Sequence, residues 1–194
     1  MREEVYEECS IVQNPKIASL KYSIISILGI LSFVVAGFMA IMFFMFYDYN
    51  KGSLLLNLLI TLVPLALFIA VGVLLTKLKK RFYVDYDYIL VSGSIRFSKV
   101  IKNKKRIFIS IFDCKNIDCI GKFGSRTFLK YVQMQDIKKV VLSSNEIPTP
   151  GTDFFYMVVS VNSVRTLYVL ECSEKLIQVI LQYSRRSVLE EDYK

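Results

Sequence analysis

The pattern of hydrophobic and polar positions divides the chain into two long apolar runs and a remainder in which apolar and polar residues alternate. The runs are Tyr22–Tyr47 and Ser53–Thr76, with 26 and 24 residues and no charged side chain. At about 1.5 Å of helical rise per residue, each exceeds the roughly 30 Å hydrocarbon core of a bilayer. Backbone polar groups in lipid must be hydrogen-bonded internally, so residues 22–76 are predicted to form a transmembrane helical hairpin. The first run begins too late, and is too long, for a cleaved signal peptide.

Basic residues beside the two runs orient this predicted hairpin. The short connector, Asp48–Gly52, holds one of them, Lys51. The other two flanks hold more: Lys16 and Lys21 on the N-terminal side, and Lys77, Lys79, Lys80 and Arg81 on the C-terminal side. Because positive charge is retained on the cytoplasmic side, both termini are predicted to be cytoplasmic in a cell-membrane protein with two spans. The C-terminal group serves as a topology anchor, as a contact for anionic lipid headgroups, or as both.

Small residues recur along both runs at a spacing that suits helix packing in lipid. Close approach of helix backbones is favoured where small residues repeat every four positions. The predicted packing residues are Gly29, Ser32, Ala36 and Ala40 in the first run and Ala66 and Ala70 in the second. The alternative is that alanine and serine are simply tolerated in membrane spans.

Period-two alternation follows the hairpin and predicts a strand-rich domain. Tight turns are expected at Ser92-Gly93, Asn103-Lys104 and Asn162-Ser163, and residues 121–135 are expected to be irregular. A C-terminal helix is predicted from Ser173 to about Ser187. The predicted strands are Phe82–Val91, Ser94–Ile101, Arg106–Phe112, Ile117–Ile120, Lys138–Leu142, Phe154–Val161 and Val164–Leu170.

The first 21 residues allow more than one structure. Residues 5–12 favour a short strand that joins the later domain, although the spacing of the glutamates also suits a helix face, and a disordered tail is the other alternative. The fold predicted for the whole chain is therefore an α+β membrane protein. It has an N-terminal cytoplasmic segment (1–21), a hairpin (22–76) and a cytoplasmic antiparallel β-sheet domain closed by a C-terminal α-helix (77–194).

The composition limits the kinds of catalytic and metal site that the chain could form. The chain carries a net charge of +8 and contains no histidine, so it lacks the usual general base and the commonest metal ligand. From Lys77 onward, 21 Lys and Arg face 12 Asp and Glu, a net charge of +9 that favours anionic lipid and does not require nucleic acid. The four cysteines, Cys9, Cys114, Cys119 and Cys172, do not have zinc-site spacing and are expected to be free thiols, mostly buried. No catalytic, cofactor or metal site is predicted.

A cluster of basic residues surrounds the second predicted turn. Juxtamembrane cations are each worth about 1 kcal/mol toward an anionic surface, so the cluster is a candidate lipid contact. The alternative is a solvated turn whose charges also protect a sheet edge from aggregation. The cluster consists of Lys99, Lys102, Lys104, Lys105 and Arg106.

The order of elements resembles the bacterial pleckstrin-homology-like domains that follow two-span membrane hairpins. The resemblance rests on the strand–turn–strand Tyr88–Ile95, on Ile107–Ile111 and on the short element Cys114–Ile117. Over nearly its full length, including the ending Tyr183–Arg186, the chain is similar to an uncharacterised family of small two-span membrane proteins from clostridia-like Gram-positive bacteria. That family has no assigned activity, so no functional residue is carried over. The resemblance implies phosphatidylglycerol and cardiolipin as the anionic lipids.

Three functions follow as hypotheses. The first is a membrane-anchored, non-enzymatic binding or scaffold module that presents its basic domain at the inner surface of the lipid bilayer. The second is an accessory or regulatory subunit of a larger membrane complex, with a protein partner or a homo-oligomer. The third is an enzyme that uses Asp85 and Asp87, which lie two residues apart on one strand face; the alternative for this pair is a solvated strand face.

Overall fold

The computed structural model describes residues 5–46, 54–184 and 188–190. The chain forms two compact units, one made of residues 1–13 and 84–194 and the other of residues 14–83. The helical unit is thus an insertion between the first and second strands of the strand-rich unit. The sequence-based division at residue 77 placed the first strand in a separate segment, whereas in the structure that strand belongs to the strand-rich unit.

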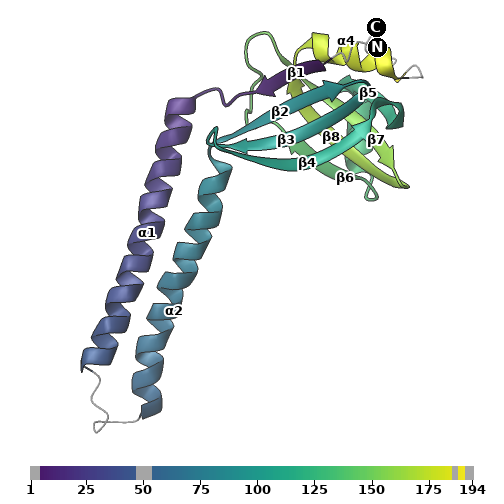
Figure 1. Cartoon of the computed structure of the whole chain (residues 1–194). Helices are drawn as coiled ribbons and strands as arrows, with labels where there is room; N and C mark the ends of the chain where they lie inside the picture. The colour runs from purple at the N-terminus through teal and green to yellow at the C-terminus, as the bar shows by residue number, and fades with distance from the viewer. Residues whose placement is uncertain (1–4, 47–53, 185–187, 191–194) are drawn as a thin grey trace. The chain divides into compact units, whose positions relative to one another are not determined.

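The helical unit contains α1 (Pro15–Phe46), α2 (Leu54–Leu78) and the short 3-10 helix η1 (Lys79–Arg81) (Figure 1). Two stretches of it, Pro15–Met45 and Leu62–Arg81, have the length and apolar composition that a membrane span requires. α1 begins seven residues before the predicted start at Tyr22, because proline fits the first position of a helix, where no intrahelical donor is needed. The predicted connector, Asp48–Gly52, lies outside the described residues.

Close contacts between α1 and α2 involve part of the predicted small-residue stripe. The Ser32 hydroxyl donates to the Phe68 carbonyl at 2.7 Å, and Ala36 is buried. A Cβ added to Gly29 would lie 3.5 Å from the Leu75 Cβ, so the absence of a side chain there permits close approach.

The α2 side of this contact differs from the predicted one. Gly72 meets the Phe33 ring so closely that a Cβ there would lie 2.9 Å from the ring. Ala66 and Ala70 are exposed, and Ala40 is half-buried. The contacting face of α2 is therefore rotated away from the predicted alanines, because spacing alone does not fix which of several small residues is buried.

The first sheet contains β1 (Val5–Ser10), β2 (Val84–Val91), β3 (Ser94–Ile101) and β4 (Lys105–Asp113), in that order and antiparallel throughout. The predicted meander is confirmed, and the N-terminal segment is a strand paired with β2. A register shift at Phe97 and Ser98 adds one residue to β4, a bulge of the kind that twists an edge strand.

The second sheet has the order β5-β7-β8-β6. Its strands are β5 (Ile117–Lys122), β6 (Lys138–Leu142), β7 (Asp153–Val161) and β8 (Val164–Cys172), and the short helix η2 (Cys114–Asn116) leads into β5. The expectation of an all-antiparallel arrangement is wrong here, since β6 runs parallel to β8. Alternation of side chains predicts a strand but carries no information about its direction.

Two helices complete the strand-rich unit: α3 (Arg126–Gln133) and α4 (Glu174–Tyr183). The expectation of an irregular segment over residues 121–135 is wrong. Ser125 caps α3 by accepting from the Phe128 amide at 3.1 Å, and Phe128, Tyr131 and Val132 turn one face of α3 toward the second sheet. α4 was expected to extend to Ser187, but the helix ends at Tyr183; residues 185–187 lie outside the described residues.

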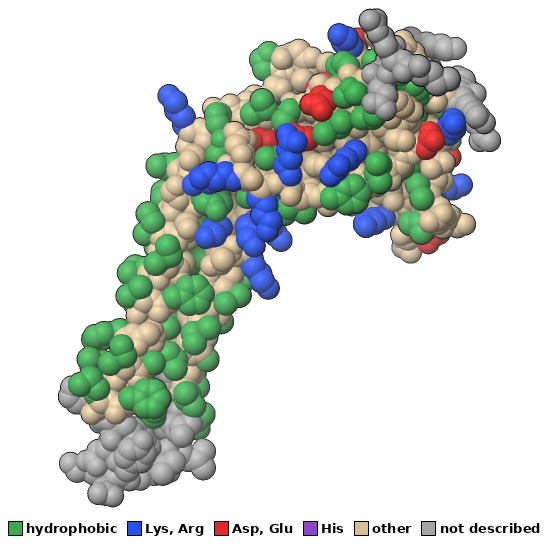
Figure 2. Space-filling model, viewed as in Figure 1, with side chains coloured by type: hydrophobic (Ala, Val, Ile, Leu, Met, Phe, Trp, Pro, Cys, Tyr) green, Lys and Arg blue, Asp and Glu red, His purple; other side chains and the backbone are tan. Residues whose placement is uncertain are grey.

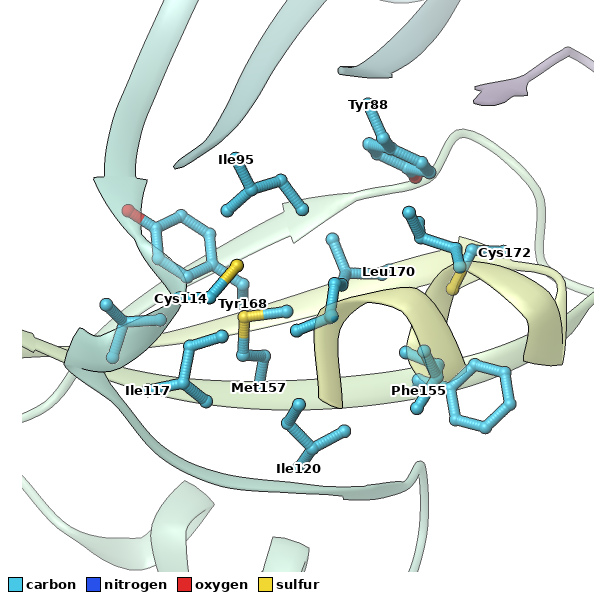
Figure 3. Packing of buried hydrophobic residues seen from close by; sticks show 14 of the residues in the cluster. Tyr88, Ile95, Cys114, Ile117, Ile120, Phe155, Met157, Tyr168, Leu170 and Cys172 are labelled. Carbon is cyan, nitrogen blue, oxygen red and sulfur yellow. The ribbon is translucent and has the colours of Figure 1, made fainter. Parts of the chain in front are cut away.

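The main core lies between the two sheets and is covered by α4 (Figure 3). Tyr88, Phe97, Phe112 and Tyr168 form its aromatic centre, with ring centroids 5.3 to 5.6 Å apart. The opposite face of the second sheet packs on α3 as a smaller cluster. Both faces of β7 and β8 are therefore buried, which explains their continuous apolar sequences.

Candidate functional site

A basic turn connects β3 to β4 in the strand-rich unit, and it carries Lys102, Lys104 and Lys105. Lys102 and Asn103 have φ angles of +52° and +54°, and the Lys104 amide donates to the Ile101 carbonyl at 3.1 Å. Two positive φ angles in a two-residue loop are typical of a type I′ turn, which matches the twist of a hairpin. The turn is one residue earlier than predicted. Lys104 and Lys105 follow it with exposed side chains.

This turn lies at the end of the first sheet from which both connections to the helical unit leave. Ile101 pairs with Val84, the first residue of β2, and Ser10, the last residue of β1, pairs with Tyr86. β2 begins three residues after Arg81, and α1 begins five residues after Ser10. The basic turn is therefore beside the points where the chain enters and leaves the strand-rich unit.

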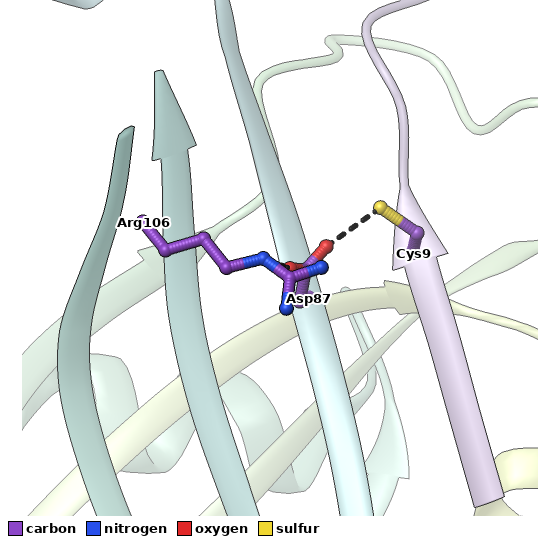
Figure 4. Close-up of polar contacts among 3 residues, drawn as sticks. All are labelled: Cys9, Asp87 and Arg106. Atoms are coloured by element: carbon purple, nitrogen blue, oxygen red, sulfur yellow. Dashed lines mark hydrogen bonds and ion pairs between the residues drawn. The ribbon is translucent and has the colours of Figure 1, made fainter. Parts of the chain in front are cut away.

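Arg106 belongs to the predicted cluster but has a partner inside the sheet (Figure 4). Its Nε lies 3.1 Å from the Asp87 Oδ2, and the Cys9 thiol donates to the Asp87 Oδ1 at 2.9 Å. Cys9 is exposed as a residue, but partial desolvation of its thiol against the sheet, followed by the hydrogen bond to Asp87, raises the pKa of Cys9 to about 12. The thiol is therefore protonated near neutral pH. The Arg106 Nε is therefore engaged by Asp87, although 72% of the Arg106 side chain is exposed.

Asp85 and Asp87 do not form the solvated strand face that was the alternative to a catalytic pair. Both residues are buried, with 2% and 8% of their surface exposed. Asp85 accepts from the Val12 amide at 2.9 Å, and burial raises the pKa of its carboxyl. Each carboxylate thus binds an element of the sheet or of the segment after β1, which is a structural role.

The cations of the helical unit are divided between exposed and packed positions. Lys77, Lys80 and Arg81 are exposed. Lys79 turns back onto α1, where its Nζ lies 3.2 Å from the Ser26 Oγ and 5.8 Å from the centre of the Tyr22 ring. In the other unit, Lys99 and Lys102 are half-buried. Figure 2 shows hydrophobic side chains covering the visible side of the helices and Lys and Arg on the visible face of the strands.

A buried carboxylate that sequence reasoning missed organises this end of the strand-rich unit. Glu171, in β8, is fully buried and accepts from Ser143 Oγ at 2.6 Å, Ser10 Oγ at 2.8 Å, Asn145 Nδ2 at 2.8 Å and the Thr149 amide at 2.9 Å. All of these donors are neutral. Burial alone would raise the pKa of the Glu171 carboxyl, but hydrogen bonds from Ser143, Thr149 and Ser10 outweigh it and hold the pKa below its ordinary value.

The same network holds the segment that leads into α1. Asn145 donates from Nδ2 to the Ile11 carbonyl and accepts at Oδ1 from the Gln13 amide, both at 2.9 Å. Ser144 donates to the Val84 carbonyl at 2.7 Å. The loop of residues 143–149 therefore fixes the end of β1 and the start of β2 together. The sequence signal was a charged residue, Glu171, directly after the apolar run of residues 167–170.

Among residues 5–46, 54–184 and 188–190, no group of three or more His, Cys, Asp or Glu side chains could hold a metal ion. The four thiols are free, with Cys114 and Cys172 buried, Cys119 half-buried and Cys9 exposed.

Comparison with known proteins gives one family. The family described as "Bacterial PH-like domain (DUF6106)" matches residues 3–190, which include the helical unit as well as both sheets. Neither the curated proteins nor the solved structures give a match. Since the match spans nearly the whole chain, this protein belongs to the family of bacterial pleckstrin-homology-like domains, DUF6106.

Proposed function

We propose that the protein is a non-enzymatic binding module anchored by α1 and α2 in the cell membrane, whose basic turn contacts anionic lipid headgroups at the inner surface. Pleckstrin-homology-like domains are typically binding modules without catalysis, which supports the non-enzymatic part. The observation that carries the proposal is the position of the 102–105 turn beside both connections to the helices. A turn held there stays near any bilayer that the helices enter.

The pairing of β1 with β2 supports a two-span hairpin. Ser10 and Tyr86 are opposite each other in one sheet, although residues 14–83 lie between them in the sequence. If α1 and α2 span a membrane, the inserted segment must begin and end on the same side. An even number of spans meets this requirement, and the exposed Lys77, Lys80 and Arg81 favour the cytoplasmic side.

Hydrogen exchange of the full-length protein in lipid nanodiscs tests the lipid contact. Amides around the 99–106 turn should exchange more slowly in discs containing phosphatidylglycerol than in discs of phosphatidylcholine alone, and salt should reduce the difference. Replacing Lys104 and Lys105 with Gln removes about 2 kcal/mol of attraction, about 30-fold in the contact equilibrium.

The double variant Lys138→Gln/Lys139→Gln is the matched control, because it removes two adjacent exposed lysines from β6. It should leave the lipid dependence of the turn unchanged. Equal exchange in both kinds of disc, or equal effects of the two double variants, would contradict a specific role for the turn.

A second candidate is an accessory subunit of a larger membrane complex. The exposed Ala66 and Ala70 favour it, because they leave small side chains on α2 that α1 does not cover. Crosslinking in native membranes should then capture a partner through this face, and Ala70→Leu should reduce the yield. Unchanged crosslinking in the Ala70→Leu variant would contradict this candidate.

A further inference from the structure

The outer strands of the two sheets differ in how their free edges are protected. The β5 edge is paired with residues 188–190 through Ile120. β1 and β6 are short strands of six and five residues, and they carry two glutamates and two lysines, respectively. Short length and charge both keep a sheet edge from pairing with another chain. β4 has nine residues with charges only at its ends, and among the described residues it pairs with β3 alone (Figure 1).

Apolar side chains are exposed along this unprotected strand. Ile107, Phe108 and Ile111 of β4 are 39%, 54% and 57% exposed. A groove of about 220 Å³ continues from β4 to the tip of the β7–β8 hairpin, and Val161 and Val164 are part of its apolar lining. A free backbone edge beside an apolar groove is the arrangement through which a sheet binds an additional strand.

The bulge in β4 determines which of its side chains share a face. Ile109 has no counterpart in β3, because Phe97 pairs with Ser110 and Ser98 pairs with Phe108. The alternation of side chains therefore restarts after Ile109. The outer face of the first sheet carries Arg106, Phe108, Ile111 and Asp113 of β4, and the inner face carries Ile107, Ser110 and Phe112.

β4 is complementary to itself when two copies run antiparallel with Phe108 of one copy opposite Ile111 of the other. In this register Arg106 lies opposite Asp113, and Ile107 lies opposite Phe112. Each pair joins side chains of the same face, with opposite charges at both ends and apolar residues between them. Arg106 is 72% exposed, so its guanidinium can reach a second carboxylate in addition to Asp87.

Other registers of the same two strands lose this match. A shift of two residues in one direction places Lys105 opposite Phe112, and a shift in the other direction places Phe108 opposite Asp113. A shift of one residue brings side chains of opposite faces together. The sequence of β4 therefore selects one antiparallel register.

A second copy of the chain fits this edge better than a bilayer does. The free N–H and C=O groups of an edge strand would stay unbonded in lipid, whereas a second strand bonds them. Among strands, β4 itself carries the required charges in reversed order. A two-fold axis between two copies forms both Arg106–Asp113 pairs at once.

We propose that two copies of the chain associate through β4, with Phe108 opposite Ile111, so that their two four-stranded first sheets form one continuous sheet. The inner side chain of Ile107 then points toward the groove beside β4 of the other copy. The two 102–105 turns lie at opposite ends of the paired strands, about 30 Å apart at 3.3 Å per residue. Both copies can therefore enter one bilayer when these strands run along its surface. The association does not depend on the lipid contact proposed above.

The mass of the full-length protein in detergent micelles tests the association. The protein should be a dimer, and Ile111→Lys should weaken dimerisation at least tenfold, because it places a charge opposite Phe108 in both copies. Val141→Lys is the matched control, since Val141 is 60% exposed on β6, the outer strand of the second sheet. This control should remain a dimer, and both variants should keep the thermal stability of the unmodified protein. A monomeric unmodified protein in micelles and in nanodiscs, or equal dimerisation of the two variants, would overturn the proposal.

Disulfide trapping tests the register. Phe108→Cys and Ile111→Cys variants, each in a Cys9→Ser background and with different tags, are mixed and oxidised. Directly opposite positions have Cβ atoms about 4.5–5.5 Å apart, so the mixed disulfide should form at least tenfold more than a disulfide within either variant. Equal yields of the three disulfides would overturn this register. Capture of a different protein by Ile111→Cys in native membranes, in place of a second copy, would overturn the assignment of the partner.

Discussion

The basic turn and the Glu171 network use charge in opposite ways. Lys104 and Lys105 are exposed on a tight turn. Glu171 is buried and receives hydrogen bonds from the Thr149 amide and from five side chains, those of Ser10, Ser143, Asn145, Thr149 and Thr152. An exposed charge contributes little to folding and is available to a ligand, whereas a buried and satisfied carboxylate contributes to folding and is not available. Charge alone therefore does not identify a binding site, because a buried and hydrogen-bonded carboxylate is not available to a ligand.

The largest expected effect is the removal of the buried carboxylate. Glu171→Ala leaves several buried donors without an acceptor and should lower the free energy of unfolding by about 3–5 kcal/mol. Glu174→Ala, in the exposed first turn of α4, is the matched control and should cost less than about 1 kcal/mol. Thermal unfolding of the full-length protein in detergent measures both. Similar losses of unfolding free energy in the two variants would contradict the inference that the buried carboxylate stabilises the fold more than an exposed one does.

The second-largest expected effect is a loss of stability at acidic pH. The pKa of Glu171 is lower in the folded protein than in the unfolded chain, so its stabilising contribution is complete above the unfolded pKa. That contribution should be lost as the pH falls through the folded pKa, with a slope of up to about 1.4 kcal/mol per pH unit from this group. Unfolding measured across acidic pH should show a shallower slope for Glu171→Gln. An unchanged slope in that variant would assign the acid sensitivity to other carboxylates.

A smaller effect is expected at Arg106, an exposed cation that is paired with a mostly buried carboxylate. Its side chain is 72% exposed, but its partner Asp87 is only 11% exposed. Arg106→Gln leaves a mostly buried carboxylate without its cation and should cost about 1–2 kcal/mol. Adding Asp87→Asn should recover part of the loss, and a double-mutant cycle measures the coupling. Additive effects would show that the ion pair does not couple these residues.

The smallest effect is expected at the turn itself. Lys102 adopts a φ angle of +52°, which an L-residue reaches at a cost and glycine does not. Lys102→Gly should therefore raise the free energy of unfolding by about 0.5–1 kcal/mol. Lys104→Gly, outside the two positive-φ positions, should not stabilise the protein, and equal gains in the two variants would contradict the turn assignment.

Long periodic segments were predictable from the sequence. The lack of charge over Tyr22–Tyr47 and Ser53–Thr76 predicted helices that overlap α1 and α2, and period-two alternation located β3 and β6. These signals depend on many residues at once, so single exceptions do not obscure them. α3 was missed because it has eight residues, although the Ser125 cap and the spacing of Phe128 and Tyr131 were visible.

Interactions between distant residues were not predictable in this way. Glu171 accepts a hydrogen bond from Ser10, which lies 161 positions earlier in the sequence. The parallel pairing of β6 with β8 depends on how the whole sheet is assembled. The predicted basic cluster did mark the turn after β3, but no pattern showed that Arg106 would be drawn to Asp87. The residues that decide exposure are brought together only by the fold.

The insertion of the helical unit between β1 and β2 constrains the order of biosynthesis. β1 leaves the ribosome first, but its partner strand follows only after residues 14–83 have been made. The N-terminal strand therefore stays without its partner until residues 14–83 have been made. If α1 and α2 enter a membrane as proposed, the sheet closes after they have done so. Since contacts that are distant in sequence form slowly, the pairing of β1 with β2 is expected to be a late step in folding. A chain with a misplaced hairpin would present an incomplete sheet edge, which is the kind of surface that cellular quality control removes.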